Sequence, residues 1–193
     1  DDQIANRKKN LESWRAAGID PYGQGYDKTH TASQIREENE GLEAGEEGEE
    51  VSYAGRLMTR RDMGKAAFLD LGDRDGSLQV YFRLNNLGEE SFKRLDWVDL
   101  GDFLGVKGQV FRTKRGEISI KVSEWTILSK AVMPPPDKFH GLKDTETRYR
   151  QRYIDLFSNA EVRKTFVVRS KIISAMRRYL DSLGFLEVET PNM

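Results

Sequence analysis

The fold is decided by residues 66–83, which read AAFLDLGDRDGSLQVYFR. Two runs of alternating apolar and polar residues flank the pair Asp75-Gly76. Alternation sends successive side chains to opposite faces of a strand. An Asp-Gly pair favours a tight turn because both residues tolerate positive φ. The stretch therefore predicts a hairpin of two antiparallel strands, 66–71 and 77–84.

Three further alternating runs surround this hairpin. One precedes it, at residues 51–61, and two follow it, at residues 103–113 and from residue 117 onward. A short helix-like insert at about residues 88–97 separates the second strand of the hairpin from the run at residues 103–113. The order β-β-β-α-β-β, with glycines at the bends, is typical of a five-stranded OB-fold barrel. We therefore expect a mainly β fold with flanking helices (α+β).

The chain is expected to fall into four parts. In order, they are an N-terminal helix with an acidic linker (1–50), the barrel (51–130), a linker (131–160) and the start of a second domain (161–193). The second linker opens with three prolines, which favour a stiff, extended spacer. The acidic segment 37–50 has almost no large apolar residue, so we expect a mobile linker or a weak helix there.

Both ends of the chain carry helix signals. The first helix is expected to end at Gly18 and to expose Arg7, Lys8 and Lys9, as a solvated face or as a phosphate contact. Near the C-terminus, a long helix at about 161–183 and a strand at 185–189 are expected; that strand is ended by Pro191. One helix and one strand cannot bury themselves, so we expect the chain to stop inside a truncated domain.

Composition excludes several classes of site. The absence of cysteine excludes disulfides and thiolate metal sites, and the two histidines, His30 and His140, have no metal-ligand spacing. No apolar run approaches the ~20 residues that cross a bilayer. A soluble, cytoplasmic protein without catalytic, cofactor-binding or metal-binding residues in this chain is therefore expected. Residues 51–130 carry 14 basic and 11 acidic side chains, a net charge of +3 (14 − 11), which leaves room for a polyanionic partner.

The alternation of side chains along the strands predicts a polar face on the outside of the expected barrel. Phe68 breaks the apolar alternation onto this face, where a nucleic-acid base could stack on the ring for ~1–3 kcal/mol. Gln79, Glu117 and Arg60 share its parity and could supply hydrogen bonds to base edges. The alternative left open is that Phe68 packs under the N-terminal helix or the insert and binds nothing.

Longer motifs resemble the class II lysyl-tRNA synthetases of the bacterial type. Residues 54–61, AGRLMTRR, resemble the first strand of the family's anticodon-binding OB domain. Residues 136–142, PDKFHGL, and 148–156, RYRQRYIDL, resemble the linker into its catalytic domain and are the most specific signal. Residues 185–191, FLEVETP, resemble motif 1, the dimer-forming element of class II synthetases.

The resemblance implies roles for particular residues. Phe68 and Gln79 would engage the central anticodon uridine of tRNA(Lys), the ring by stacking and the amide by hydrogen bonds. Arg60 and Glu117 match further positions of the anticodon site, and Pro191 would close motif 1 in a homodimer. The full-length enzyme would be a lysine–tRNA ligase that activates lysine with ATP and Mg²⁺. Because motifs 2 and 3 are absent, this chain is expected to be inactive alone and to bind no cofactor.

Three other readings remain open at this point. Aspartyl- and asparaginyl-type synthetases share the barrel. A non-enzymatic OB-fold module would bind single-stranded nucleic acid without discriminating among bases, and a protein-interaction domain would dimerise through the long helix and bind no RNA.

Overall fold

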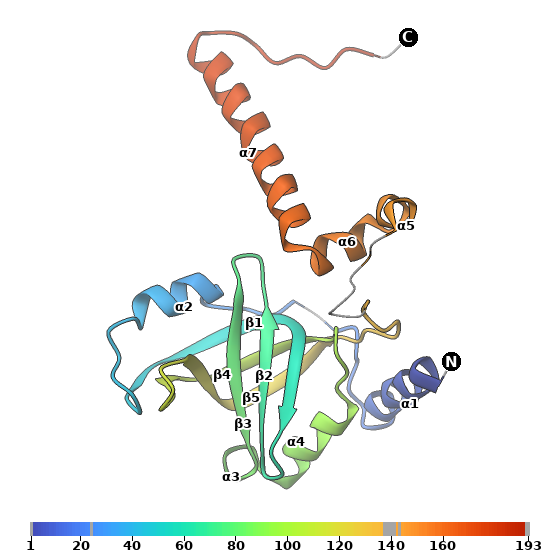
Figure 1. Ribbon diagram of the computed structural model, residues 1–193, viewed down its shortest axis with the longest axis vertical. Coiled ribbons are helices and arrows are strands. Elements are labelled where there is room, and N and C mark those ends of the chain that lie inside the picture. Colours follow the sequence, from blue (N-terminus) through green and yellow to red (C-terminus); the bar gives the residue numbers. More distant parts are fainter. Residues whose placement is uncertain (1, 24, 137–141, 143, 192–193) are drawn as a thin grey trace. The chain divides into compact units, whose positions relative to one another are not determined.

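The computed structural model describes residues 2–23, 25–136, 142 and 144–191. The chain divides into two compact units, Asp1–Pro134 and Pro135–Met193. The first contains a β-barrel with short helices around it, and the second consists of helices (Figure 1). The linker motif residues 137–141, which include His140, lie outside the described residues.

A closed barrel of five strands forms the centre of the first unit. Its strands run in the order β1-β2-β3-β5-β4, and all neighbours are antiparallel except β3 and β5, which are parallel. The predicted five-stranded OB-fold barrel is thereby confirmed. The strands are β1 (Glu47–Asp62), β2 (Ala66–Gly72), β3 (Ser77–Arg83), β4 (Phe103–Arg112) and β5 (Ile118–Ser129).

The predicted hairpin is formed by β2 and β3, but by a different turn mechanism. Gly76 has no positive φ. Instead, the Asp73 carboxylate accepts hydrogen bonds from the backbone N–H groups of Asp75 (2.9 Å) and Gly76 (3.0 Å). An aspartate side chain that bonds to the backbone two residues ahead imitates a backbone turn. The predicted hairpin is confirmed, but the reason given for its turn was wrong, because neither Asp75 nor Gly76 adopts a positive φ.

The inward side chains of the strands form the core. Leu78, Val80 and Phe82 of β3 are fully buried, as are Leu69 and Leu71 of β2. This pattern confirms the inward parity that alternation predicted for both strands. The barrel closes most tightly at a bulge in β4, where a Cβ on Gly108 would lie 2.1 Å from the carbonyl oxygen of Lys121. Only glycine permits this approach.

Helix α1 (Asp2–Ala16) packs against the rest of the first unit through a tryptophan and an arginine. Trp14 is buried and meets Trp97 and Trp125 edge-on, with ring centroids 5.2 and 5.8 Å apart. Arg7 is also buried, and its Nη1 donates to the carbonyls of Leu100 (2.9 Å) and Ala131 (2.8 Å). The prediction of an exposed Arg7 was therefore wrong, because two carbonyls of the barrel unit capture its guanidinium.

Helix α2 (Ala32–Glu38) was not predicted. Its Thr31–Gln34 capping box satisfies the first-turn donors, and Ala32 and Ile35 are buried in the barrel core. After it, residues 47–50, expected to belong to an acidic linker, begin β1 and pair with β4. The insert between β3 and β4 consists of α3 (Leu84–Leu87), α4 (Glu89–Lys93) and the 3₁₀ helix η1 (Arg94–Trp97).

The second unit contains α5 (Thr145–Arg150), α6 (Arg152–Ser158) and α7 (Ala160–Ser182). Asp155 joins them, because its buried carboxylate accepts from Arg148, Arg152 and Asn159. The prediction of a strand at 185–189 was wrong, because residues 185–190 form no strand. A strand needs a hydrogen-bonding neighbour, and the described part of this unit contains no strand with which these residues could pair. None of the described helices is both long enough and apolar enough to cross a membrane.

Candidate nucleic-acid interface

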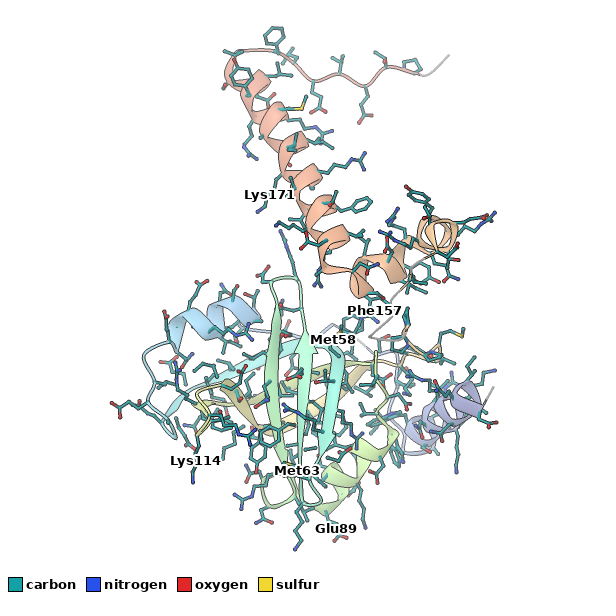
Figure 2. The ribbon with its side chains drawn as sticks, viewed as in Figure 1. Met58, Met63, Glu89, Lys114, Phe157 and Lys171 are labelled. Carbon is teal, nitrogen blue, oxygen red and sulfur yellow. The ribbon has the colours of Figure 1, made fainter. Side chains whose placement is uncertain are left out.

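A groove of about 670 Å³ lies on the outer face of the barrel. Its lining side chains include Met63 in the β1–β2 connection and Lys114 in the β4–β5 turn (Figure 2). Three of the four predicted anticodon residues line it together. The full lining consists of Arg61, Met63, Phe68, Asp70, Ser77, Gln79, Thr113, Lys114, Arg115 and Glu117.

Strand register arranges residues on the outer side of the barrel in two adjacent rows, of which Arg61, Phe68, Asp70 and Gln79 line the groove. The first row runs Arg61, Phe68, Tyr81, Lys121 across β1, β2, β3 and β5. Two residues further along the strands, the second row runs Thr59, Asp70, Gln79, Ser119 across the same strands. The first row is aromatic and cationic, and the second is polar and uncharged except for one carboxylate. The first row can therefore stack on a base while the second row, next to it, can form hydrogen bonds with that base.

Phe68 is the centre of the first row. Its ring stacks on Tyr81 with centroids 4.6 Å apart and an angle of 27° between the planes. On the other flank, the guanidinium carbon of Arg61 lies over the Phe68 ring, 6.0 Å from its centroid. The ring lines the groove and does not lie under α1, which packs against η1. A planar base could enter between Phe68 and Arg61 after a modest outward shift of the Arg61 side chain.

Gln79 and Glu117 supply hydrogen-bonding groups next to this stack. The Gln79 Oε1 accepts from the hydroxyl of Ser119 at 3.0 Å. Glu117 is exposed at the groove rim, and its backbone N–H donates to Thr113 Oγ1 at 3.0 Å. Its carboxylate lies 4.0 Å from the Arg36 guanidinium. Both side chains can therefore exchange hydrogen bonds with a base that stacks on Phe68.

Arg60 is the predicted site residue that the structure does not bring into the groove. The register of β1 against β2 slips between Leu57 and Thr59, which adds one residue to β1. Such a bulge reverses the parity of every residue beyond it. Arg61 consequently pairs with Phe68 and faces the groove, while Arg60 pairs with Leu69. Strand parity alone misplaced Arg60 and missed Arg61.

The Arg60 guanidinium is bound to the insert instead. Nη1 donates to the carbonyls of Leu95 (2.5 Å) and Val98 (3.2 Å), and Nε donates to Asp62 Oδ1 at 2.9 Å. Arg56 stacks over Phe103, with its guanidinium carbon 4.2 Å from the ring centroid, and burial lowers its pKa. These two arginines hold the barrel wall and its insert together.

Charge in the groove favours an anion. Arg61, Lys114 and Arg115 line it, against the carboxylates of Asp70 and Glu117. A modest cationic excess next to an aromatic platform is typical of proteins that track a single-stranded phosphate backbone.

The described residues offer no metal centre, because no three His, Asp or Glu side chains gather around a possible ion. His30 is held by local contacts: Nδ1 lies 2.7 Å from Thr29 Oγ1 and Nε2 lies 3.1 Å from Glu38. Pro191 lies in the second unit, exposed, nine residues after the end of α7.

Comparison with known proteins agrees with this geometry. Residues 51–128 match a family described as OB-fold nucleic acid binding domain, and residues 144–193 match the class II tRNA synthetases (D, K and N). The chain is 50% identical over 192 residues to a lysine–tRNA ligase of Moorella thermoacetica, covering 100% of this chain and 38% of the relative.

Two further lysine–tRNA ligases give the same result. That of Halalkalibacterium halodurans is 48% identical over 195 residues, covering 100% of this chain and 39% of the relative. That of Lactococcus lactis subsp. lactis is 50% identical over 194 residues, covering 98% and 39%. The chain thus spans about two fifths of the length of these curated relatives. The chain carries an OB-fold nucleic acid binding domain followed by part of a class II tRNA synthetase domain, and along its whole length it is similar to lysine–tRNA ligases.

Proposed function

We propose that the groove binds the anticodon loop of tRNA(Lys) and reads its central uridine. The observation that carries the proposal is the placement of Phe68 outside the barrel, between Tyr81 and Arg61 and beside the Gln79 amide. A ring in this position can stack on a base, and the neighbouring amide can pair with the edge of that base. Arg61 and Glu117 complete the set of groups around it. A contact from Arg60, which the family resemblance suggests, would require its guanidinium to leave the insert.

The experiment measures binding of the 193-residue chain to a labelled anticodon stem-loop by fluorescence anisotropy. The parent should bind a UUU loop more tightly than a loop whose central base is changed. Phe68→Ala should weaken binding of the UUU loop about 10- to 100-fold, the equivalent of one lost stack. Gln79→Ala should weaken it less and should reduce the preference for uridine. Neither change should unfold the barrel, because both side chains are only half-buried.

Two matched controls remove the same chemical groups elsewhere in the first unit. Tyr22→Ala removes an exposed aromatic ring, and Gln109→Ala removes an exposed amide of β4 that bonds to Gly48. Both should bind like the parent. Equal affinity for every loop sequence would favour a general single-strand binder, and no binding at all would favour a protein-interaction module. If Phe68→Ala and Gln79→Ala bind like the parent, the proposed site is wrong.

The same proposal extends to the protein that carries this region. We infer that it is a cytoplasmic lysine–tRNA ligase, which activates lysine with ATP and Mg²⁺ and transfers it to tRNA(Lys). The similarity to lysine–tRNA ligases along the whole of this chain supports this inference. Among the described residues, no three His, Asp or Glu side chains gather around a possible ion.

We also propose that α7 forms a homodimer contact, as the resemblance of residues 185–191 to motif 1 suggests. Along α7, large apolar side chains are exposed, among them Ile172 (54%), Met176 (59%) and Tyr179 (65%). Beside them, the segment after the helix turns back and forms a groove of about 290 Å³ whose lining is mostly apolar, with Leu180 and Phe185 on its walls. An exposed apolar surface of this kind marks an interaction site. Pro191 follows this segment and would lie at the edge of the contact.

A further inference from the structure

We infer that Ser119 is a positioning residue that orients the Gln79 amide, so that its NH₂ group, and not its oxygen, faces the groove. Ser119 lies in the same row as Gln79, and it is fully buried. The inference rests on the proposed function, because it concerns which base the groove accepts.

The first support is the hydrogen bond between the two side chains. Ser119 and Gln79 are cross-strand partners in the parallel pair of β3 and β5 that closes the barrel. The Ser119 hydroxyl donates to Gln79 Oε1 at 3.0 Å. A hydroxyl that is buried without an acceptor is costly. Turning the amide over would remove the acceptor that this hydroxyl uses.

The second support comes from the other neighbour of Gln79 in the same row. Asp70 is its cross-strand partner on β2, and the Asp70 carboxylate lines the groove. An ionised carboxylate only accepts hydrogen bonds, so it attracts an amide NH₂ group and repels an amide oxygen. Thr59 donates to the same carboxylate from β1, which holds it in the row. A donor on one side and an acceptor on the other therefore turn the Gln79 amide in the same direction.

This orientation has a consequence for base choice. A fixed NH₂ group donates a hydrogen bond, which a carbonyl oxygen of uracil can accept. Cytosine carries an amino group where uracil carries O4, so two donors would then face each other. Ser119 thus helps to set the preference for uracil over cytosine without touching the base. Its contribution should be visible as selectivity and not only as affinity.

The test compares the affinities of the chain for anticodon stem-loops with U or C at the central position. In Ser119→Ala, the affinity for the U loop should fall about three- to tenfold, the usual size of one hydrogen bond. The affinity for the C loop should hardly change, so the U/C ratio should fall by a similar factor. Ser123→Ala is the matched control: it removes a hydroxyl of β5 that is exposed and bonded to the Lys107 carbonyl. It should leave the ratio unchanged.

A double-mutant cycle separates positioning from a purely structural role. With Gln79→Ala already present, adding Ser119→Ala should not lower the U/C ratio further, because the group that Ser119 orients is gone. An equal further loss would overturn the inference. Should Ser119→Ala fail to fold, Ser119→Cys, which has a similar shape and a weaker donor, should also lower the ratio.

The outcomes also distinguish the inference from the function on which it rests. A parent chain that does not prefer the U loop would overturn the proposed function. A parent that prefers the U loop, together with a folded Ser119→Ala that keeps the parental ratio, would overturn only the role of Ser119.

Discussion

Replacing two adjacent arginines should have opposite consequences for stability and binding, because a bulge separates their environments. Arg60 is bonded to the insert and is 20% exposed, whereas Arg61 is exposed and overhangs Phe68 in the groove. We expect Arg60→Ala to destabilise the barrel and Arg61→Ala to weaken RNA binding. Strand parity without the bulge predicts the reverse for binding.

The size of each effect follows from the contacts. Arg60 donates from a charged group to two backbone carbonyls of the insert, those of Leu95 and Val98. Hydrogen bonds of charged groups contribute about 1.5–3 kcal/mol. For a unit of this size, we expect the melting temperature of Arg60→Ala to fall by about 5–10 °C. The Arg60→Ala protein that remains folded should bind the UUU loop with an affinity within about threefold of that of the parent.

Arg61→Ala loses little stability, since its only described ring contact is a solvent-exposed one with Phe68. A cation over an aromatic ring at such a site contributes about 0.5–1 kcal/mol. Binding should fall about tenfold, and the slope of log K against log salt should decrease by about one, as for the loss of one phosphate contact. Thermal unfolding followed by circular dichroism and anisotropy across a salt series measure both quantities.

Arg15→Ala is the matched control, because Arg15 is an exposed arginine of α1 paired only with Glu12 in the described contacts. It should match the parent in stability and should bind equally well. The reasoning is refuted if Arg60→Ala keeps the parental melting temperature and loses binding while Arg61→Ala binds normally. That result would place Arg60 in the groove in solution.

Two further predictions concern the buried ion pair and the helix surface. Lys130→Met leaves Asp102, and Asp99 beside it, without the ammonium that both bind, which should cost about 3–5 kcal/mol at pH 7. Burial raises the pKa of Asp102 and the lysine opposes that shift, so its loss should raise the folded-state pKa further above the unfolded value. The stability that protonation of Asp102 contributes is then present at low pH and lost as the pH rises. Urea unfolding should therefore show a smaller loss of unfolding free energy for Lys130→Met at pH 5 than at pH 7. An equal or larger loss at pH 5 would contradict this. Met176→Glu, which places a charge among the exposed apolar side chains of α7, should convert a dimer to a monomer in sedimentation analysis, whereas Lys171→Glu on the same helix should not.

Several features missed by pattern analysis depend on partners that are distant in sequence. Residues 47–50 look like an acidic linker, yet they extend β1 because β4, more than 50 residues away, offers a free edge. Helix α2 has few apolar residues, and it is held by its capping box and by docking Ile35 in the core. Residues 185–189 alternate like a strand but have no pairing partner among the described residues.

The amino-acid sequence alone determined the five strands, their inward side chains, the hairpin and the resemblance to synthetases. Each of these depends on local periodicity or on a contiguous motif, which neighbouring residues carry by themselves. It also placed Phe68, Gln79 and Glu117 on one face, as the groove shows.

Only the tertiary structure decided which arginine joins them and which residue lies beside Gln79. The bulge after Leu57 exchanges Arg60 for Arg61, and the pairing of β3 with β5 places the buried Ser119 next to Gln79. Register and closure are properties of paired strands. A single strand cannot specify them, because a slip of one residue moves every following side chain to the opposite face.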